Sequence, residues 1–412
     1  MDELLAQYAD VAGHDAVDYL CQLAAPLAGA RVVHVNSTRE GGGVAEILHK
    51  LVPLMQAVGL EARWEVIEGD EDFYRCTKGF HNALQGGPAA LSDPLLRAYE
   101  QANARNAEAL RPVLEDADFV VIHDPQPAPL LSHCPNRRGK WVWRCHIDAS
   151  HPDRRVWRYL RPWVEPYDAS IFSLAEFARA LSHPQYLIPP SIDPLSPKNR
   201  ELPPSDVRGV CERFGLDPRR PLVLQVSRFD RFKDPLGVLQ AYRLVKQMTP
   251  LQLVLAGGGA VDDPEGDAVL DEVRRAAEGD PDAHVLLLPN DAHETVNALQ
   301  RAADVVLQKS VREGFGLTVA EAMWKGRPVI GGDTGGIRLQ VVNHYTGFLV
   351  QTPEGAALRI RYLLHRKDVR REMGERARRF VGENYLITRL VRDYLALFTG
   401  LEREGERIEV GC

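Results

Sequence analysis

Short apolar runs alternate with amphipathic stretches along most of the chain. In the first half the apolar runs are RVVHVN, ARWEVIE, DFVVIHD, KWVWRCHID and ASIFS. Between the first two, apolar residues recur at the spacing of one helical face, at Val44, Ile47, Leu48, Leu51, Leu54 and Val58. A second helix is predicted over about 95–110. Strands that alternate with helices predict a parallel sheet covered by helices on both faces.

The second half restarts the same alternation. Its apolar runs are PLVLQVSRF, LQLVLAGGG, AHVLLLPN, ADVVLQKS and RPVIGGD. The segment between the halves has six prolines in residues 187–206 and no periodicity, which predicts a hinge over 191–206. The predicted fold is α/β, with two Rossmann-like, doubly wound domains at 1–190 and 207–384. Because such sheets bind ligands at the carboxyl ends of their strands, we expect a working cleft between the domains.

The composition limits the classes of function. A chain of 412 residues exceeds the ~150 residues of an average domain. A net charge of -7 argues against nucleic acid as a partner. Six cysteines without a CxxC pair, and three scattered D-x-D pairs in an acidic chain, indicate neither a disulfide framework nor a metal site. No signal peptide and no apolar run of ~20 residues is seen, so we expect a cytoplasmic protein without a membrane partner.

Three consecutive glycines lie in HVNSTREGGGVAEIL, residues 34–48. A dinucleotide fingerprint needs a small residue where this sequence has Glu46, so the pattern argues against NAD. A tight turn explains one glycine well but three poorly. The remaining interpretation is that a ligand approaches the bare backbone of Gly42 and Gly43 at a helix N-terminus.

Two basic residues follow the first strand of the second half, in QVSRFDRFKDPLG. Asp234 and Pro235 match the N-cap and first position of a helix. Lys233 beside that positive helix end is unfavourable by itself, and a bound diphosphate would resolve the conflict. Arg228 would add a bidentate fork for phosphate. The alternative is a solvated basic loop.

Two carboxylates follow the strand DVVLQ. Glu313 lies in a glycine-rich loop, and Glu321 is predicted within the first turn of a helix that starts at about Thr318. Both can reach one ligand at the strand ends, where carboxylates bind the vicinal hydroxyls of ribose or hexose. The alternative for Glu321 is an acid that stabilises the helix N-terminus without a ligand.

Histidine and aspartate end two strands of the first half. His123 and Asp124 follow one strand, and His146 and Asp148 follow another. We expect all four to face the cleft, although a single histidine is as often structural as functional.

These motifs together resemble the retaining glycosyltransferases of family 4, which have the GT-B fold. The glutamate pair within EGFGLTVAEAMWKGRPVIG is a fairly specific signature. HVNSTREGGGVAEIL, GFHNALQG, VVIHDPQPAPLL and WVWRCHID resemble, more narrowly, the glycosyltransferring synthases that make trehalose from a nucleotide-activated glucose and free glucose. The resemblance covers residues 32–398.

The resemblance implies a nucleotide-sugar donor, ADP-, UDP- or GDP-glucose, and no further cofactor. Arg228 and Lys233 would bind the diphosphate, Glu321 the ribose and Glu313 the donor glucose. The remaining donor contacts would come from Gly42, Gly43, Asn290, Gly314, Phe315, Gly316 and Leu317. Asp333 would lie near the diphosphate and should point away from it.

The resemblance also implies the acceptor side and the reaction. His146 would contact the donor sugar or the reacting centre, and Asp124 and Asp148 are acceptor-side candidates. The domain at 1–190 would bind the acceptor, the domain at 207–384 the donor, and a helix in 385–412 would cross back to the first domain. The reaction would be reversible front-side displacement with retained anomeric configuration. Its catalytic groups would be Arg228, Lys233, Glu313 and His146. A homodimer is one expected assembly of the protein.

Three other functions compete with this one. A trehalose phosphorylase would use inorganic phosphate in place of the nucleotide. A two-lobed protein could bind nucleotide or sugar without turnover. An NAD oxidoreductase is the weakest alternative because both glycine motifs lack the fingerprint.

Overall fold

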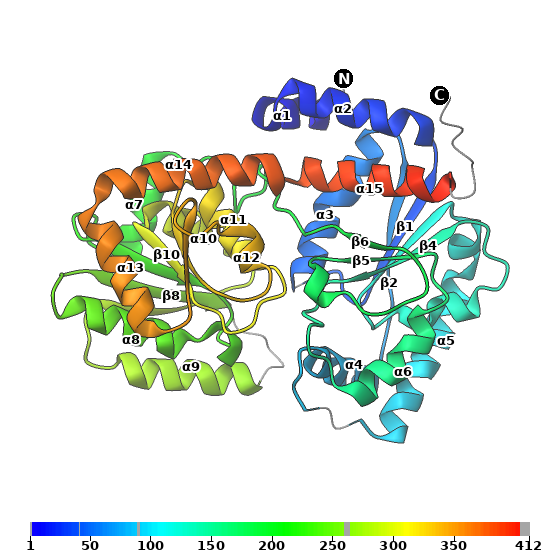
Figure 1. The fold of residues 1–412 in the computed structure, drawn as a ribbon, viewed down its shortest axis with the longest axis horizontal. Helices are drawn as coiled ribbons and strands as arrows, with labels where there is room; N and C mark the ends of the chain where they lie inside the picture. The colour runs from blue at the N-terminus through cyan, green and yellow to red at the C-terminus, as the bar shows by residue number, and fades with distance from the viewer. Residues whose placement is uncertain (1, 41, 89–90, 259–263, 404–412) are drawn as a thin grey trace, which may run out of the picture. The chain divides into compact units, whose positions relative to one another are not determined.

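The computed structural model describes residues 2–40, 42–88, 91–258 and 264–403 (Figure 1). The chain divides into two compact units. Unit 1 is Met1–Pro190 with Ile387–Cys412, and unit 2 is Ser191–Leu386. The expected hinge, 191–206, falls in unit 2, where helix α7 already begins at Pro204. Residues 404–412 of the predicted C-terminal segment lie outside the described residues.

Unit 1 contains a parallel sheet of six strands. The strand order is β2-β1-β3-β4-β5-β6, so the chain reverses direction across the sheet between β1 and β3, the topological switch point of a doubly wound fold. The strands are β1 (Arg31–Asn36), β2 (Glu61–Val66), β3 (Phe119–His123), β4 (Lys140–Cys145), β5 (Ala169–Phe172) and β6 (Gln185–Leu187). The α-helices are α1 (Glu3–Ala12), α2 (His14–Ala24), α3 (Gly42–Ala57), α4 (Glu71–Leu84), α5 (Asp93–Asp116), α6 (Arg154–Val164) and α15 (Ile387–Glu402).

The central strands of unit 1 are buried along their length, which explains why they read as continuous apolar runs. Helix α15 supplies part of this core although it lies far away in sequence. Its Phe398 stacks on Phe119 of β3 with ring centroids 4.4 Å apart, and α15 also packs against α2 and α3. The C-terminal helix is therefore an integral layer of unit 1 (Figure 1).

Unit 2 contains the second parallel sheet, with strand order β12-β11-β10-β7-β8-β9. This is the Rossmann order, and its switch point lies between β7 and β10. The strands are β7 (Leu222–Val226), β8 (Gln252–Gly258), β9 (Ala283–Leu288), β10 (Val305–Gln308), β11 (Val329–Gly332) and β12 (Gly347–Val350). The α-helices are α7 (Pro204–Arg213), α8 (Pro235–Lys246), α9 (Pro264–Ala277), α10 (His293–Ala302), α11 (Leu317–Trp324), α12 (Ile337–Gln340), α13 (Pro353–His365) and α14 (Lys367–Asn384).

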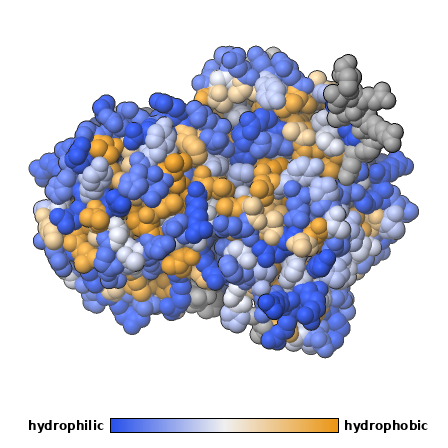
Figure 2. All heavy atoms as spheres, in the orientation of Figure 1, coloured by the Kyte–Doolittle hydropathy of each residue, from blue (hydrophilic) through white to orange (hydrophobic). Residues whose placement is uncertain are grey.

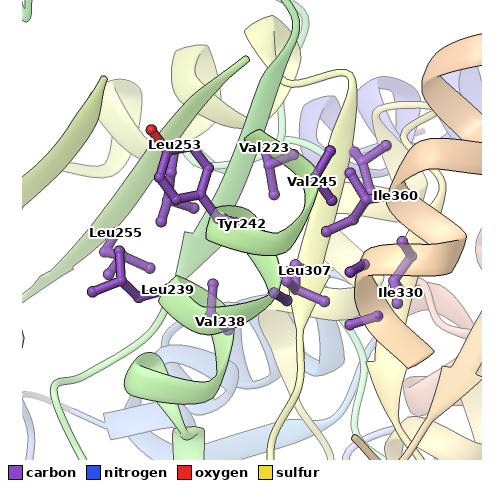
Figure 3. Packing of buried hydrophobic residues seen from close by; sticks show 14 of the residues in the cluster. Val223, Val238, Leu239, Tyr242, Val245, Leu253, Leu255, Leu307, Ile330 and Ile360 are labelled. Atoms are coloured by element: carbon purple, nitrogen blue, oxygen red, sulfur yellow. The ribbon is translucent and has the colours of Figure 1, made fainter. Parts of the chain in front are cut away.

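The core of unit 2 lies between its sheet and the helices α8 and α13. Figure 3 shows Val223, Leu253 and Leu307 of the strands facing Tyr242 of α8 and Ile360 of α13. All five residues are completely buried. Since a buried aliphatic side chain contributes about 1.5–3 kcal/mol, this layer fixes the strand ends that carry the polar loops.

The structure confirms the prediction of an α/β protein with two doubly wound parallel sheets. It adds elements that the apolar pattern does not reveal, notably the edge strands β6 and β12 and the N-terminal pair α1 and α2. One local prediction is wrong. Helix α11 begins at Leu317 and has no acidic residue in its first turn, so Glu321 lies in the second turn.

No helix of the described residues is long and apolar enough to cross a membrane. Figure 2 shows hydrophilic side chains over much of the drawn face of each unit, with hydrophobic ones between them. Within the described ranges, no group of three or more histidine, cysteine or acidic residues could hold a metal ion.

Candidate active site

The polar loops of unit 2 meet at its switch point. One loop follows β7 and carries Lys233, and the other follows β10 and carries Glu313. The Nζ atom of Lys233 lies 2.7 Å from Oε2 of Glu313, and the two side chains are 18% and 11% exposed. This partly buried ion pair joins both loops at the edge where doubly wound sheets bind ligands.

The loop after β7 is held by its own backbone and by the strand. The side-chain amide of Gln225 donates to the carbonyl of Lys233 at 2.7 Å, and Asp230 accepts from the backbone N–H of Phe232 at 2.7 Å. Arg228 differs, because its side chain is 60% exposed and its closest carboxylate oxygen, on Asp230, is 3.5 Å away. The guanidinium of Arg228 is therefore accessible to an anion.

Asp234 is the N-cap of α8, as predicted, with Pro235 at the first helical position. Its carboxylate accepts from the N–H of Gly237 at 3.1 Å and also pairs with the buried Lys309. The conflict between Lys233 and the helix dipole is thus offset by protein groups, Asp234 and Glu313, without a diphosphate. Lys233 therefore does not require a bound anion for its charge to be balanced, and the position of its ion pair with Glu313 is what indicates a ligand site.

The Glu313 loop needs glycine in the segment that packs against it. A Cβ atom on Gly335 would lie 1.8 Å from the carbonyl oxygen of Glu313, and one on Gly336 would lie 2.3 Å from Cα of Phe315. Gly316 has φ +83°, a left-handed conformation that favours glycine, and α11 starts at the next residue, Leu317. The loop backbone from Gly314 to Leu317 is therefore fixed at a helix N-terminus.

Glu321 is buried, with 1% of its side chain exposed. Neither carboxylate oxygen has a hydrogen bond among the described residues, and Nζ of Lys198 lies 3.6 Å from Oε1. Below it, Lys325 donates to Asn199 at 2.9 Å and to Gln300 at 2.8 Å. A buried carboxylate without hydrogen bonds is uncommon, and ligand hydroxyls would supply the missing donors.

Two further residues predicted for the donor side, Asn290 and Asp333, follow β9 and β11 at the same edge of the sheet. Asn290 follows β9, and its Oδ1 would lie 2.7 Å from a Cβ atom on Gly258, so the glycine lets this side chain approach β8. Asp333 accepts a hydrogen bond from Nε of Arg338 at 2.7 Å. This bond lowers the pKa of Asp333. The expectation that Asp333 points away from a diphosphate stays a prediction.

The switch point of unit 1 carries histidines. His123 ends β3, and its Nδ1 lies 2.9 Å from Nε2 of His146, just after β4. The carboxylate of Asp124 accepts from the backbone N–H of His146 at 2.7 Å, and Asp148 accepts from the hydroxyl of Ser150 at 2.6 Å. Asp124 is thus engaged by the loop after β4 and Asp148 by its own loop, while His146 is half-buried.

Gly42 and Gly43 are the first two residues of α3. Gly42 has φ +80°, so its conformation alone favours glycine. We expect Gly42→Ala to lower the free energy of unfolding by about 1–2 kcal/mol, and Gly43→Ala to leave it unchanged or raise it by up to about 1 kcal/mol. Denaturant titrations of both variants measure this, with kcat/KM alongside. Loss of activity in Gly43→Ala with intact stability supports the approach of a ligand to this backbone. Full activity would show that the glycines form only a turn.

Asp124 also has a left-handed backbone, with φ 65°, which asparagine tolerates. Burial raises the pKa of Asp124 to about 7, above the value of about 3.9 in an unfolded chain. The group therefore contributes stability that is complete below about pH 4 and is lost as the pH rises through about 7. Asp124→Asn should remove this loss, at most about 4 kcal/mol, while keeping the hydrogen bond from His146. Thermal unfolding from pH 4 to 8 tests it; identical pH dependence in both proteins contradicts it.

The sequence alone did not single out two residues of these sites. His34, in the middle of β1, contacts His123, with 3.0 Å between Nδ1 and Nε2. Lys198 lies beside Glu321, although the sequence places it in the expected hinge. A polar residue within a fully buried strand was the available signal for His34, whereas nothing in the proline-rich segment distinguishes Lys198.

The chain is similar to known proteins over most of its length. A family model described as trehalose synthase, N-terminal domain, matches residues 34–179, and one described as glycosyl transferases group 1 matches residues 212–380. Trehalose synthase of Thermococcus litoralis is 48% identical over 398 residues, which are 95% of this chain and 96% of that protein.

Two weaker similarities extend the comparison. Trehalose phosphorylase of Pleurotus pulmonarius is 29% identical, over 86% of this chain and 55% of that protein. The solved structure of sucrose-phosphate synthase from Thermosynechococcus elongatus has a TM-score of 0.71 at 18% identity, over 91% of this chain and 100% of that chain. The chain therefore belongs to the trehalose synthase family and is a glycosyltransferase with the GT-B fold.

Proposed function

We propose that the protein transfers glucose, reversibly and with retention, from a nucleoside diphosphate glucose to free glucose and so forms α,α-trehalose. The observation that carries the proposal is the Lys233–Glu313 ion pair, 2.7 Å apart at the switch point of unit 2. A cation and a carboxylate fixed side by side suit a ligand in which a phosphate adjoins a sugar, because each group then meets its complementary partner.

The donor binds to unit 2 in this proposal. Lys233 and the exposed Arg228 contact the diphosphate, as a point charge and a bidentate fork respectively. Glu313 accepts hydrogen bonds from the glucose hydroxyls, and the backbone N–H groups of Gly314 to Leu317 donate to the ligand at the start of α11. Glu321 accepts from the ribose hydroxyls and gains the partners that its buried oxygens lack. Asn290 lies on the side of the nucleotide base.

The reaction follows from these contacts. The bond between the anomeric carbon and the diphosphate oxygen breaks, and both cations stabilise the negative charge that develops on the leaving group. The hydroxyl of the acceptor glucose attacks the same face, and its proton passes to the departing phosphate oxygen. The new bond keeps the anomeric configuration, and no protein nucleophile is needed. Electrostatic stabilisation of the leaving group supplies most of the rate enhancement.

Residues of unit 1 serve the sugars. His146 is the group assigned to the donor sugar or the reacting centre, and the backbone of Gly42 and Gly43 contacts sugar and phosphate. Asp124 and Asp148 are kept as acceptor-side candidates, although Asp124 already accepts a hydrogen bond from the backbone of His146 and Asp148 accepts two from Ser150.

The competing function is trehalose phosphorolysis, since a phosphorylase shares 29% of the aligned residues. The experiment that separates the two incubates the protein with glucose and ADP-, UDP- or GDP-glucose, and separately with trehalose and inorganic phosphate. Trehalose formed from at least one nucleotide donor supports the proposal. Glucose 1-phosphate formed from trehalose and phosphate, with no reaction of any nucleotide donor, selects the phosphorylase.

Nucleotide preference has a cheaper test. A nucleotide at about 100 times its Kd raises the free energy of unfolding by about 2.7 kcal/mol. Thermal unfolding with ADP, UDP and GDP therefore ranks the three before any assay of turnover.

A further inference from the structure

Three histidines form a hydrogen-bonded chain across the switch point of unit 1. His34 lies in β1, His123 ends β3 and His146 follows β4, so the chain crosses three adjacent strands. Nδ1 of His34 lies 3.0 Å from Nε2 of His123, and Nδ1 of His123 lies 2.9 Å from Nε2 of His146. His34 and His123 are 0% and 2% exposed, whereas His146 reaches the surface in part.

All three imidazoles are neutral near pH 7. Burial, reinforced by the charge of Arg144, lowers the pKa of His34 to about 3 and the pKa values of His123 and His146 well below their usual range. Three groups face the row of hydrogen-bonded histidines. Arg144 of β4 donates to the hydroxyl of Tyr394 at 2.8 Å, the Tyr394 ring of α15 packs edge-on to His34, and Asp124 holds the backbone N–H of His146.

A neutral imidazole has one donor nitrogen and one acceptor nitrogen. Two arrangements therefore satisfy both bonds of the chain. In the first, every histidine carries its hydrogen on Nδ1, and His34 leaves a lone pair on Nε2 without a partner. In the second, every hydrogen is on Nε2, and His34 leaves an N–H without a partner. The structure gives Nε2 of His34 no hydrogen bond among the described residues.

The first arrangement is favoured for two reasons. A buried N–H without an acceptor is rarer and costs more than an acceptor that lacks a donor. The positive charge of the buried Arg144 also acts on His34, and it favours a lone pair over an N–H dipole of the same sign. In this arrangement Nδ1 of His146 carries a hydrogen, and this nitrogen has no hydrogen-bond partner in the described part of the chain.

We propose that His34 and His123 are positioning residues that fix neutral His146 with its hydrogen on Nδ1, so that His146 donates to a sugar oxygen and does not act as a base. The assignment of a sugar as the ligand rests on the proposed function; the tautomer does not. In this proposal His146 serves as a hydrogen-bond donor only, because the acceptor proton passes to the departing phosphate.

The direct test is ¹⁵N NMR of the full-length protein labelled at histidine, at pH 7 and without substrate. Loss of signals in His34→Gln, His123→Gln and His146→Gln assigns each ring. We expect Nδ1 of His146 to be protonated and Nε2 to be bare, with the same pattern in the other two rings. A hydrogen on Nε2 of His146, or on both of its nitrogens, overturns the proposal. Because no turnover is needed, a failed trehalose assay leaves this result standing and contradicts only the proposed function.

Kinetics then test whether the tautomer matters. His123→Phe fills the space without either hydrogen bond, and it should move the His146 nitrogen signals toward a mixture of tautomers and lower kcat by about tenfold. His123→Gln keeps one donor and one acceptor and should recover part of kcat. His133→Gln, at a histidine that takes no part in these hydrogen bonds, should have the same kcat and the same His146 signals as the natural protein. Unchanged His146 signals in a folded His123→Phe protein would overturn the positioning role.

Discussion

Lys233→Ala is expected to lower kcat/KM with the nucleotide-glucose donor by about 100-fold to 1000-fold, the usual effect of removing one group that stabilises transition-state charge. The Nζ atom of Lys233 is held 2.7 Å from Oε2 of Glu313, and the backbone carbonyl of Lys233 accepts a hydrogen bond from the side chain of Gln225. Since it is positioned before the ligand binds, its charge acts on the leaving diphosphate without reorganisation. Steady-state kinetics with saturating glucose measure the loss.

The variant also leaves Glu313 as a partly buried charge without its partner, which by itself destabilises the fold. The double variant Lys233→Ala with Glu313→Gln removes that charge, so the difference in thermal stability between it and Lys233→Ala measures the cost of the unpaired carboxylate. Lys246→Ala is the matched control, because Lys246 also pairs with carboxylates of unit 2, Asp280 and Asp282. Near-normal kcat/KM in a folded Lys233→Ala protein would contradict the proposed role of this lysine in catalysis.

Glu321→Gln is expected to weaken nucleotide binding by roughly 10-fold to 100-fold, the effect of losing about 1.5–3 kcal/mol of charge-assisted hydrogen bonding. The carboxylate is buried, and no described residue donates a hydrogen bond to either oxygen. Its substitution removes no side-chain hydrogen bond from the described part of the folded protein, but it removes the charge that faces Lys198 at 3.6 Å, so we expect a loss of thermal stability smaller than the loss of binding. Calorimetric titration with the preferred nucleoside diphosphate measures the binding.

Glu354→Gln is the control for this variant, since Glu354 lies exposed in the first turn of α13. The two results together decide the role of Glu321. Weaker nucleotide binding with a stable fold identifies a ligand-binding carboxylate. A large loss of stability with normal binding would instead show that Glu321 serves the cluster around Lys198 and Lys325.

The sequence predicted most of the fold because buried parallel strands leave an apolar signature. The runs that contain β1, β3, β7 and β10 were recognisable for this reason. The edge strands β6 and β12 were missed. β6 is short, and its Tyr186 is partly buried between two exposed neighbours, so the strand leaves no apolar run in the sequence.

The candidate site was predicted as a set of residues, but its pairing was not. Lys233 and Glu313 are separated by 80 positions in the sequence, and only the strand order of unit 2 brings them together. Asp234 illustrates the opposite case, because an N-cap is a local feature and the DP dipeptide was sufficient to predict it.

The histidine chain shows a third kind of limit. His146 was proposed from its place at a strand end, whereas His34 sits among valines in RVVHVN and reads as an interior residue. Its contact with His123 follows from the adjacency of β1 and β3, which only the topology of the sheet specifies.

The most direct test of the central claim is the structure of the product formed from nucleotide-glucose labelled with ¹³C at the anomeric carbon and unlabelled glucose. NMR of the purified disaccharide reports both linkage and configuration. The proposed function predicts α,α-trehalose with the label in one ring and the α-configuration at the labelled carbon. A β-linked product, or no disaccharide from any of the three nucleotide donors, would contradict it.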